Sequence, residues 1–444
     1  MNKKPQYAII GLGVTGLSCA KYLAKNNVPF VAMDTRENPP NLQQFENEYP
    51  NAKLVLGGLD EGLLDSATDL VISPGISLET PLIKKQVQSG KSIIGDIEMF
   101  AREVNAPVIA ITGTNAKSTV TSLVGEMAAN EGLKVKVGGN LGIPALDLID
   151  ESVDVYVLEL SSFQLERVQS LNPKVATVLN VSPDHLDRYS SFDEYAKVKK
   201  YIYNNCEVAV CNGDDSLTDC GTSYEKAKLT FISGKPKDQE FGLIEKNQQT
   251  YLAHGDELLM QVAELPKLGG HFKYNALAAL AVGCGFGFSI SAMIKTLKDF
   301  KGLEHRCQLV KIKNGVFWYN DSKGTNIGAT IAAIEGLGPE AQGKLILIAG
   351  GIGKNADFKD LAKALNKHVT TLVLIGEDAK KIAEVASSSI DIKFADSMQN
   401  AVEICHKAAS SGDIVLLSPA CASFDMFKDF EHRGQVFTEI VEQL

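Results

Sequence analysis

The chain has 444 residues, of which 45% are hydrophobic and 22% are charged, a composition typical of a globular protein with several cores. At roughly 100–200 residues per domain, this length predicts two to four domains. The net charge of −10 argues against a general nucleic-acid binder, which needs a basic face. No stretch approaches the ~18 apolar residues of a membrane span. The eight cysteines form no C-x-x-C pair, and the N-terminus does not resemble a signal peptide, so we expect reduced thiols and a cytoplasmic location.

Residues 7–94 alternate short apolar strands with amphipathic helices. A strand at Tyr7–Ile10 runs into the G-x-G-x-x-G motif of residues 11–16, a helix over 17–26 and a second strand ending before Asp34. This βαβ pattern predicts a nucleotide diphosphate at the helix N-terminus, and NAD is one alternative. A later strand at Asp69–Ile72 ends in Ser73-Pro74-Gly75, either a ligand loop at the same sheet edge or a plain turn.

A second motif begins at residue 107 and reads PVIAITGTNAKSTVT. It predicts a strand over 108–111, a tight loop, and a helix whose first residues include Lys117 and Ser118. This is the plan of a phosphate-binding loop, in which Lys117 supplies charge and the Ser118 hydroxyl can reach magnesium. The strict pattern is not met, because Ile111 and Ala116 stand at its two glycine positions. The alternative is an ordinary strand-to-helix turn with a solvated lysine.

Polar side chains follow the next predicted strands. Glu159 ends a strand over 153–158, where a magnesium ligand or a helix N-terminal carboxylate is expected. His185 follows a strand over 175–179, and we consider a metal or catalytic role for it as well as a structural one. A helix over 195–204 then carries three lysines, which would normally be a solvated face. From residue 301, polar loops follow strands near 317–319, 345–349 and 413–417, and they should share one edge of a parallel sheet.

Eight motifs of this chain resemble those of the Mur ligases, in the same order and over essentially the whole length. They are TGTNAKST, LELSSFQ, DHLDRY, HFKYNALAA, HRCQ, NDSKGTN, GGIGKNADF and SPACASFDMFKDFEHRG. The last motif and the compact first domain are similar to the D-glutamate-adding branch. The D-N-P-R motif of the diaminopimelate- and lysine-adding branches is absent. Folylpolyglutamate synthetases share the central motifs but would not begin with GLGVTG.

The resemblance implies a three-domain α/β fold and an amide ligase. Residues 1–94 would form a Rossmann-like domain for the UDP substrate, 95–300 a P-loop-like ATP-binding domain with a mostly parallel sheet, and 301–444 a Rossmann-like domain for the amino acid. The implied reaction is ATP-dependent addition of D-glutamate to UDP-N-acetylmuramoyl-L-alanine through an acyl phosphate. We expect a monomer without nucleic-acid or membrane partners.

The resemblance also implies roles for particular residues. The substrate site would contain Val14, Thr15, Asp34, Thr35, Arg36, Ser73, Pro74, Gly75, Asn140, Ser161 and Gln164. The ATP site would contain Gly113, Thr114, Asn115, Ala116, Lys117, Ser118, Thr119, Asn275, Arg306 and Asp321. D-glutamate would contact Lys323, Thr325, Lys354, Ser423, Phe424 and Phe430. Two Mg²⁺ ions would bind Ser118, Glu159, His185 and Lys199, with Lys117, Asn140, His185 and Lys199 as the catalytic set.

Two points of this comparison stay open. The family lysine that reacts with carbon dioxide to form a carbamate corresponds to Lys199, but the spacing from His185 leaves Lys197 and Lys200 as alternatives. Ala116 replaces the usual glycine, and we expect a negative φ at this residue, where its methyl group would be tolerated. A non-catalytic nucleotide sensor of ligase descent, and an NAD-dependent oxidoreductase, are the alternative functions.

Overall fold

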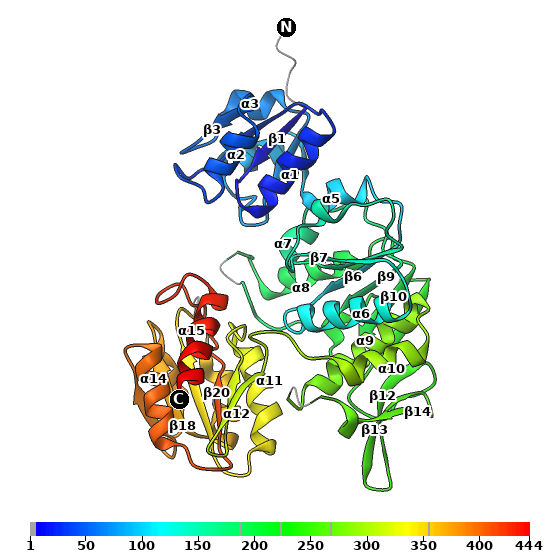
Figure 1. Ribbon diagram of the computed structural model, residues 1–444. Helices are drawn as coiled ribbons and strands as arrows, with labels where there is room; N and C mark the ends of the chain where they lie inside the picture. The colour runs from blue at the N-terminus through cyan, green and yellow to red at the C-terminus, as the bar shows by residue number, and fades with distance from the viewer. Residues whose placement is uncertain (1–5, 186–187, 223, 267–268, 354–355) are drawn as a thin grey trace.

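The computed structural model describes residues 6–185, 188–222, 224–266, 269–353 and 356–444, and these residues form three β-sheets flanked by helices (Figure 1). The sheets belong to three units that follow one another along the chain. In Figure 1 the N-terminal unit lies at the top, the central unit below it, and the C-terminal unit at the lower left. The predicted fold class, α/β with largely parallel sheets, is confirmed.

The N-terminal sheet pairs its strands in parallel in the order β3-β2-β1-β4-β5. The strands are β1 (Tyr7–Ile10), β2 (Phe30–Met33), β3 (Lys53–Val55), β4 (Asp69–Ile72) and β5 (Ser92–Ile94). The helices are α1 (Val14–Lys25), α2 (Leu42–Glu48), α3 (Glu61–Ser66) and α4 (Pro81–Gln88). A Cβ atom at Gly16 would lie 1.8 Å from the carbonyl oxygen of Gly11. Glycine at this position therefore lets α1 begin directly against the end of β1.

The central sheet has the order β14-β13-β12-β11-β10-β9-β6-β8-β7, parallel from β7 to β12 and antiparallel from β12 to β14. Its strands are β6 (Val108–Thr112), β7 (Val135–Gly139), β8 (Val155–Glu159), β9 (Val175–Val178), β10 (Val208–Asn212), β11 (Ala227–Phe231), β12 (Glu240–Lys246), β13 (Gln249–His254) and β14 (Glu257–Gln261). Its helices are α5 (Asp96–Ala101), α6 (Lys117–Asn130), α7 (Ser162–Leu165), α8 (Phe192–Lys200), α9 (Phe272–Phe286) and α10 (Ile290–Asp299). Buried residues of α6 and α9 pack with the sheet in one hydrophobic core.

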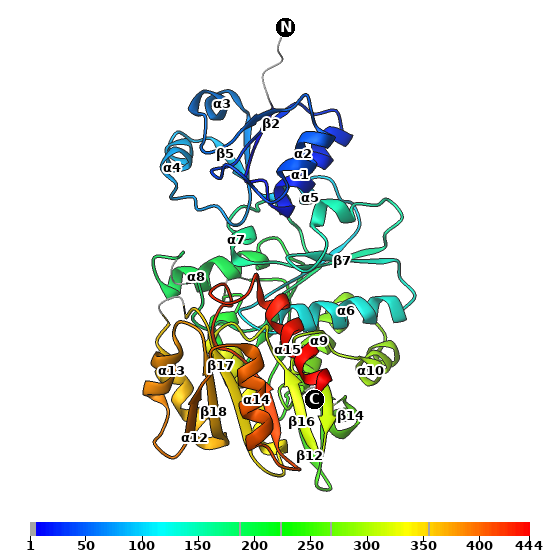
Figure 2. The same cartoon turned by 60° about the vertical axis from the view of Figure 1, so that its left-hand side comes forward.

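The C-terminal sheet has the order β15-β16-β20-β17-β18-β19, with β15 as an antiparallel edge strand. Its strands are β15 (Gln308–Lys313), β16 (Val316–Asn320), β17 (Leu345–Gly350), β18 (Val369–Ile375), β19 (Asp391–Phe394) and β20 (Ile414–Leu417). Its helices are α11 (Ile327–Leu337), α12 (Leu361–His368), α13 (Ala379–Val385), α14 (Met398–Ala408) and α15 (Phe430–Gln443), and they cover both faces of the sheet (Figure 2). Because β16, β20 and β17 are parallel neighbours, their polar loops share one edge, as predicted.

Two predicted helices have different bounds in the structure. Helix α1 begins at Val14, inside the glycine motif, and not at residue 17. Helix α8 occupies Phe192–Lys200 where 195–204 was predicted, because the Ser191 side chain accepts a hydrogen bond from the backbone N–H of Glu194 and starts the helix early. A short 3₁₀ turn, Tyr201–Tyr203, follows it. Among the helices that the structure describes, none is both long and apolar enough to cross a membrane.

Candidate active site

The connection between β6 and α6 has the shape of a phosphate-binding loop. Helix α6 begins at Lys117, and its N-cap residue Ala116 has no side chain that could cap it, so the first backbone N–H groups can face a ligand. The Lys117 ammonium folds back onto the loop and donates to the carbonyl oxygens of Gly113 at 2.9 Å and Thr114 at 2.8 Å. Burial lowers the pKa of Lys117, while the Glu159 carboxylate acts in the opposite direction.

The expectation of a negative φ at Ala116 is wrong. Ala116 has φ 66° and ψ −6°, in the left-handed region, at the position where the loop turns into α6. For an L-residue this conformation costs roughly 1–2 kcal/mol, because Cβ approaches the following carbonyl oxygen. The turn therefore needs the backbone conformation that glycine adopts freely, and this chain adopts it with alanine.

Glu159 is buried at the end of β8, with 2% of its surface exposed. Its Oε1 accepts a hydrogen bond of 2.6 Å from Asn140 Nδ2, while Oε2 has no hydrogen-bond partner among the described residues. Burial raises the pKa of Glu159, but Lys117 and Ser118 lower it, and the net pKa is below the usual range. An ionised, buried carboxylate oxygen without a partner, close to a hydroxyl, fits a hard cation such as Mg²⁺.

Of the three candidate lysines on α8, Lys199 reaches the phosphate loop. It is buried, with 2% exposure, and its Nζ donates to the carbonyl oxygen of Gly113 at 2.9 Å. The Nζ also lies 4.7 Å from the centre of the Tyr195 ring. Burial lowers the pKa of Lys199 well below its usual value, and the neighbouring Lys117 lowers it further. Lys197 is exposed, and Lys200 lies partly exposed at the end of the helix.

His185 lies beside the same loop system, beyond the end of β9. Its Nε2 is 3.7 Å from Asp184 Oδ2, and its ring meets the Phe163 ring edge-on with centres 4.9 Å apart. Asn326 of the C-terminal unit donates from Nδ2 to Asp184 Oδ2 at 3.3 Å and to Asn115 Oδ1 at 3.0 Å. The region next to His185 is therefore joined to both the phosphate loop and the C-terminal unit.

A cavity of about 620 Å³ lies between the N-terminal and central units. It is lined by Gly11, Gly13, Val14, Thr15, Asp34, Thr35, Arg36, Ser73, Pro74, Gly75, Ile76, Gly139, Asn140, Gly142, Pro144 and Gln164. The cavity thus brings together every substrate residue expected from the sequence except Ser161. The Ser161 hydroxyl instead caps α7 by accepting a hydrogen bond of 3.2 Å from the Gln164 N–H.

Asp34 does not offer the free carboxylate that the NAD alternative needs. One oxygen accepts from the Leu12 N–H at 2.7 Å, and both bind the guanidinium of Arg36, at 2.7 and 2.9 Å. Burial raises the pKa of Asp34, but these hydrogen bonds outweigh it and keep the carboxylate ionised. Because ribose recognition in dinucleotide folds uses this carboxylate, its pairing with Arg36 argues against NAD.

Two arginines that the sequence analysis missed hold the Ser73-Pro74-Gly75 loop. Buried Arg167 donates to the carbonyl oxygens of Ile72 at 3.0 Å, Ser73 at 2.7 Å and Ile76 at 2.6 Å. Arg188 donates to the carbonyl oxygen of Gly75 at 3.0 Å. Both arginines belong to the central unit, so they attach the N-terminal unit to it at one wall of the cavity. No local motif marks Arg167, because its partners lie about 90 residues away in sequence.

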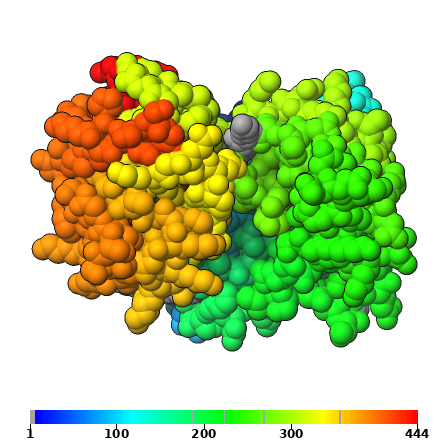
Figure 3. Space-filling model, turned by 90° about the horizontal axis from the view of Figure 1, so that it is seen from below, coloured from blue at the N-terminus to red at the C-terminus, as the bar shows by residue number. Residues whose placement is uncertain are grey.

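A second cavity, of about 220 Å³, lies between the central and C-terminal units. Its lining includes seven residues expected to bind the nucleotide or D-glutamate: Asn115, Ala116, Thr119, Asn275, Arg306, Asp321 and Lys323. Figure 3 shows the groove between these units from below, with the C-terminal unit on the left. Arg306 crosses it, and its Nη2 donates to the Ser118 hydroxyl at 2.7 Å.

The C-terminal wall of this second cavity carries two groups with shifted pKa values. Burial raises the pKa of Asp321 to about 6, although its Oδ2 accepts a hydrogen bond of 2.7 Å from Ser418. Burial lowers the pKa of Lys323 to about 8, and its Nζ lies 3.5 Å from the centre of the Phe430 ring.

The other residues expected to bind D-glutamate differ in how far they are exposed to solvent. Thr325 is partly buried next to Lys323, to whose carbonyl oxygen its N–H donates. Ser423 is buried, but 67% of Phe424 is exposed. Lys354 lies outside the described residues.

Three family models match consecutive parts of the chain. They are the Mur ligase MurD-like N-terminal domain over residues 5–95, the Mur ligase middle domain over 111–283 and the Mur ligase glutamate ligase domain over 305–421. The chain therefore belongs to the Mur ligase family.

Within this family the chain is similar to enzymes named UDP-N-acetylmuramoylalanine–D-glutamate ligase. It is 50% identical over 444 residues to that of Coxiella burnetii (strain CbuK_Q154), covering 100% of both chains. It is 49% identical to that of Legionella pneumophila (strain Paris), covering 99% of both. Among solved structures, MurF from Acinetobacter baumannii matches with a TM-score of 0.64 at 19% identity, over 98% of this chain and 90% of that one, which shows the shared fold.

Proposed function

We propose that this protein joins D-glutamate to UDP-N-acetylmuramoyl-L-alanine with ATP, in the cytoplasm, as a step of peptidoglycan precursor synthesis. The chain is about 50% identical, over its full length, to enzymes that are named for this reaction, and this identity supports the proposal. The proposal rests mainly on one observation: two cavities meet at the same cluster, formed by the phosphate loop and Glu159. Asn140 lines the larger cavity and binds Glu159, while Ala116 and Thr119 of the phosphate loop line the smaller one.

The larger cavity suits the uridine nucleotide substrate. Helix α1 begins at Val14 without a side-chain cap, so its N-terminus can accept the diphosphate. The Arg36 guanidinium, half exposed and fixed by Asp34, can donate to the base. Asn140 and Gln164 lie at the central-unit side of the cavity, where they can orient the L-alanine carboxylate towards the phosphate loop.

The reaction needs activation of that carboxylate. One of its oxygens forms a bond to the γ-phosphorus of ATP, the bond from this phosphorus to the bridging oxygen breaks, and ADP leaves. Lys117 and the N-terminus of α6 stabilise the negative charge on the transferring phosphoryl group. The amine of D-glutamate then attacks the carbonyl carbon, loses a proton, and phosphate leaves. Lys323, whose pKa of about 8 keeps it mostly protonated at neutral pH, can pair with a D-glutamate carboxylate.

The same cluster fits two Mg²⁺ ions, which would neutralise phosphate charge and orient the oxygens. Among the described residues, Oε2 of Glu159 has no hydrogen-bond partner, and together with the Ser118 hydroxyl it fits the first ion. His185 with a carbamate on Lys199 would hold the second. A lysine must be neutral to react with carbon dioxide, and burial favours the neutral form of Lys199. Arg306 must leave the Ser118 hydroxyl before that oxygen can bind a cation.

The proposal is tested by phosphate release with UDP-N-acetylmuramoyl-L-alanine, ATP, magnesium and one amino acid at a time. We expect product with D-glutamate and little with L-glutamate. Equal turnover with both, or none with either, would contradict the proposal. The protein should be a monomer by light scattering.

A nucleotide sensor without catalysis is the second candidate, and the left-handed Ala116 favours it, since a strained loop can weaken ATP binding. Glu159 and Lys199 are nonetheless buried beside that loop, and Lys117 is partly buried against it. Binding of ATP without phosphate release, when every substrate is present, would identify a sensor.

A further inference from the structure

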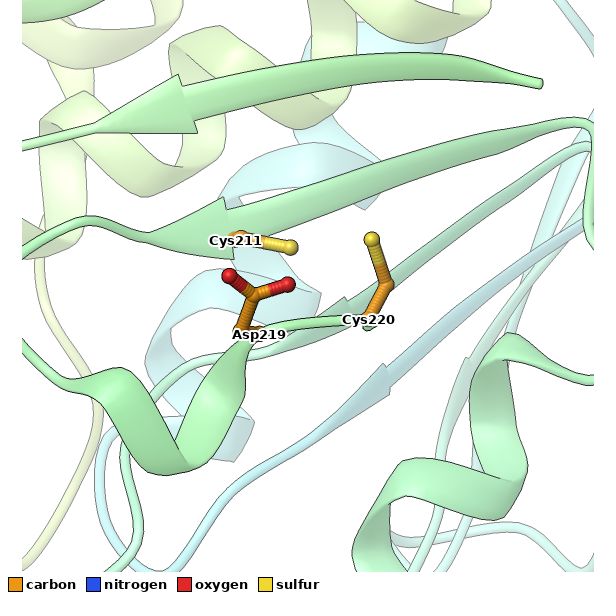
Figure 4. Close-up of side chains that lie close together, drawn as sticks. All are labelled: Cys211, Asp219 and Cys220. Atoms are coloured by element: carbon orange, nitrogen blue, oxygen red, sulfur yellow. The ribbon is translucent and has the colours of Figure 1, made fainter. Parts of the chain in front are cut away.

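Two thiols and a carboxylate converge at the carboxyl end of β10, two strands away from the phosphate-loop strand β6. The potential ligand atoms of Cys211, Asp219 and Cys220 all lie within 4.8 Å of one another (Figure 4). Cys211 is buried, Cys220 is half-buried and Asp219 is exposed. In Figure 4 the side chain of Cys211 comes from the strand, and the other two come from the segment that passes beside it. The proposed ligase reaction uses none of the three.

The fold holds this segment beside β10 before any ion binds. The Thr218 hydroxyl accepts from the Asn212 N–H at 3.0 Å and donates to the Asn212 carbonyl oxygen at 3.0 Å. The buried Tyr203 hydroxyl lies within hydrogen-bonding distance of the carbonyl oxygens of Val210, at 3.0 Å, and Thr218, at 2.9 Å. The residues that flank Cys211 and precede Asp219 are therefore fixed to each other, which reduces the entropy cost of gathering the ligands.

We infer that Cys211, Asp219 and Cys220 form a binding site for one thiophilic divalent cation of the Zn²⁺ class. Two thiolates and one carboxylate are ligands that zinc accepts, and a water molecule would complete a tetrahedron. With Zn–S bonds of about 2.3 Å, tetrahedral ligands stand roughly 3.7 Å apart. The observed separations need to shrink by about 1 Å at most, which small side-chain rotations can supply. Magnesium and calcium prefer all-oxygen sites, so this site is chemically distinct from the Glu159 cluster.

Two features set the affinity of the site. The Lys228 ammonium lies 3.3 Å from Asp219 Oδ1 and competes with a cation for that oxygen. Both thiols must lose a proton when they bind a metal as thiolates, so metal affinity should rise with pH.

The test uses the full-length protein, reduced with a phosphine, and Co²⁺ as a spectroscopic substitute for Zn²⁺. Cobalt bound by thiolates gives a sulfur-to-metal charge-transfer band, whereas cobalt at the oxygen- and nitrogen-rich phosphate-loop cluster does not. We expect one equivalent to produce the band, and excess Zn²⁺ to remove it. Cys220→Ser and Cys211→Ser should each abolish the band, while the matched control Cys284→Ser, which removes a half-buried thiol on α9, should keep it.

Lys228→Gln should tighten cobalt binding severalfold, because the competing ammonium is gone. Phosphate release by Cys220→Ser should equal that of the unmodified protein, and its far-UV circular dichroism would show that it folds. Absence of the band in the reduced protein, or its persistence in Cys220→Ser, would overturn the inference. Loss of two thiols on mild oxidation, without any cobalt band in the reduced state, would identify a redox pair and also overturn it.

Discussion

Ala116 adopts a left-handed backbone conformation that its methyl group makes unfavourable. At φ 66°, replacing it by glycine should relieve roughly 1–2 kcal/mol of strain, against roughly 0.4–1 kcal/mol lost to the greater freedom of the unfolded chain. We therefore expect Ala116→Gly to keep or raise the Tm, and to tighten ATP binding, since the loop reaches its phosphate-binding conformation more easily.

Ala129 provides the matched control, because it is an exposed alanine in the last turn of the same helix α6. There glycine relieves no strain and costs up to about 1 kcal/mol of helix stability. Differential scanning fluorimetry should show a lower Tm for Ala129→Gly only. Equal losses in the two variants would show that the left-handed turn carries no strain.

Lys199 is buried on α8 and its ammonium group contacts the phosphate loop, whereas Lys197 on the same helix faces solvent. Lys199→Ala should lower phosphate release by several orders of magnitude, because the proposed carbamate could not form, and added acetate should restore part of the activity. Lys197→Ala should leave the rate close to that of the unmodified enzyme. If Lys197→Ala is inactive while Lys199→Ala is active, the carbamate proposed for Lys199 is assigned to the wrong lysine.

At the scale of elements, the segment after α7 sets the position of the loop after β4. Arg167 donates to three carbonyl groups at the end of β4 and in that loop, and a lysine cannot reach all of them. Arg167→Lys should raise KM for the uridine substrate about tenfold, the equivalent of one hydrogen bond worth ~1.4 kcal/mol. KM for ATP should change little, since the cavity proposed for ATP lies between the central and C-terminal units.

Arg102→Lys is the control for this measurement, because Arg102 also belongs to the central unit but pairs with Glu98 through a hydrogen bond of 2.9 Å. It should leave both KM values unchanged. If Arg167→Lys raises the KM for ATP as much as that for the uridine substrate, Arg167 stabilises the fold in general and does not position the substrate loop.

At the scale of the whole molecule, Asn326 and Arg306 join the C-terminal unit to the central unit across the groove between them. Asn326→Ser keeps a side chain that can cap α11 but is too short to reach Asn115 and Asp184. We expect a larger radius of gyration by small-angle scattering for the ligand-free variant, and the original value when ATP and both substrates are bound.

Ser397→Ala removes a comparable helix cap, that of α14 on the outer side of the C-terminal unit (Figure 1). Its radius of gyration should not change. A similar expansion in both variants, or none in Asn326→Ser, would show that the Asn326 contacts do not hold the two units together.

The sequence by itself determined the three α/β units and most of the loops at the sheet edges. Apolar strands such as Val108–Thr112 and Val175–Val178 can be recognised from their own residues. Parallel strands then bring the loops that follow them to one edge of the sheet. Because both follow parallel strands, Glu159 and the phosphate loop could be predicted to lie at the same edge of the sheet. The exact start of α8 escaped prediction because a single capping serine shifted it.

Only the tertiary structure decided the rest. The Arg167 contacts, the Asn326 bridge and the choice of Lys199 over its neighbours depend on residues that approach from about 90 to 210 positions away, and periodicity carries no information about such pairs. The φ of Ala116 is likewise set by how β6 and α6 are held, not by the preference of alanine. Cys211 and Cys220 are close in the chain, but they became a candidate metal site only when the fold turned both thiols to the same side of β10.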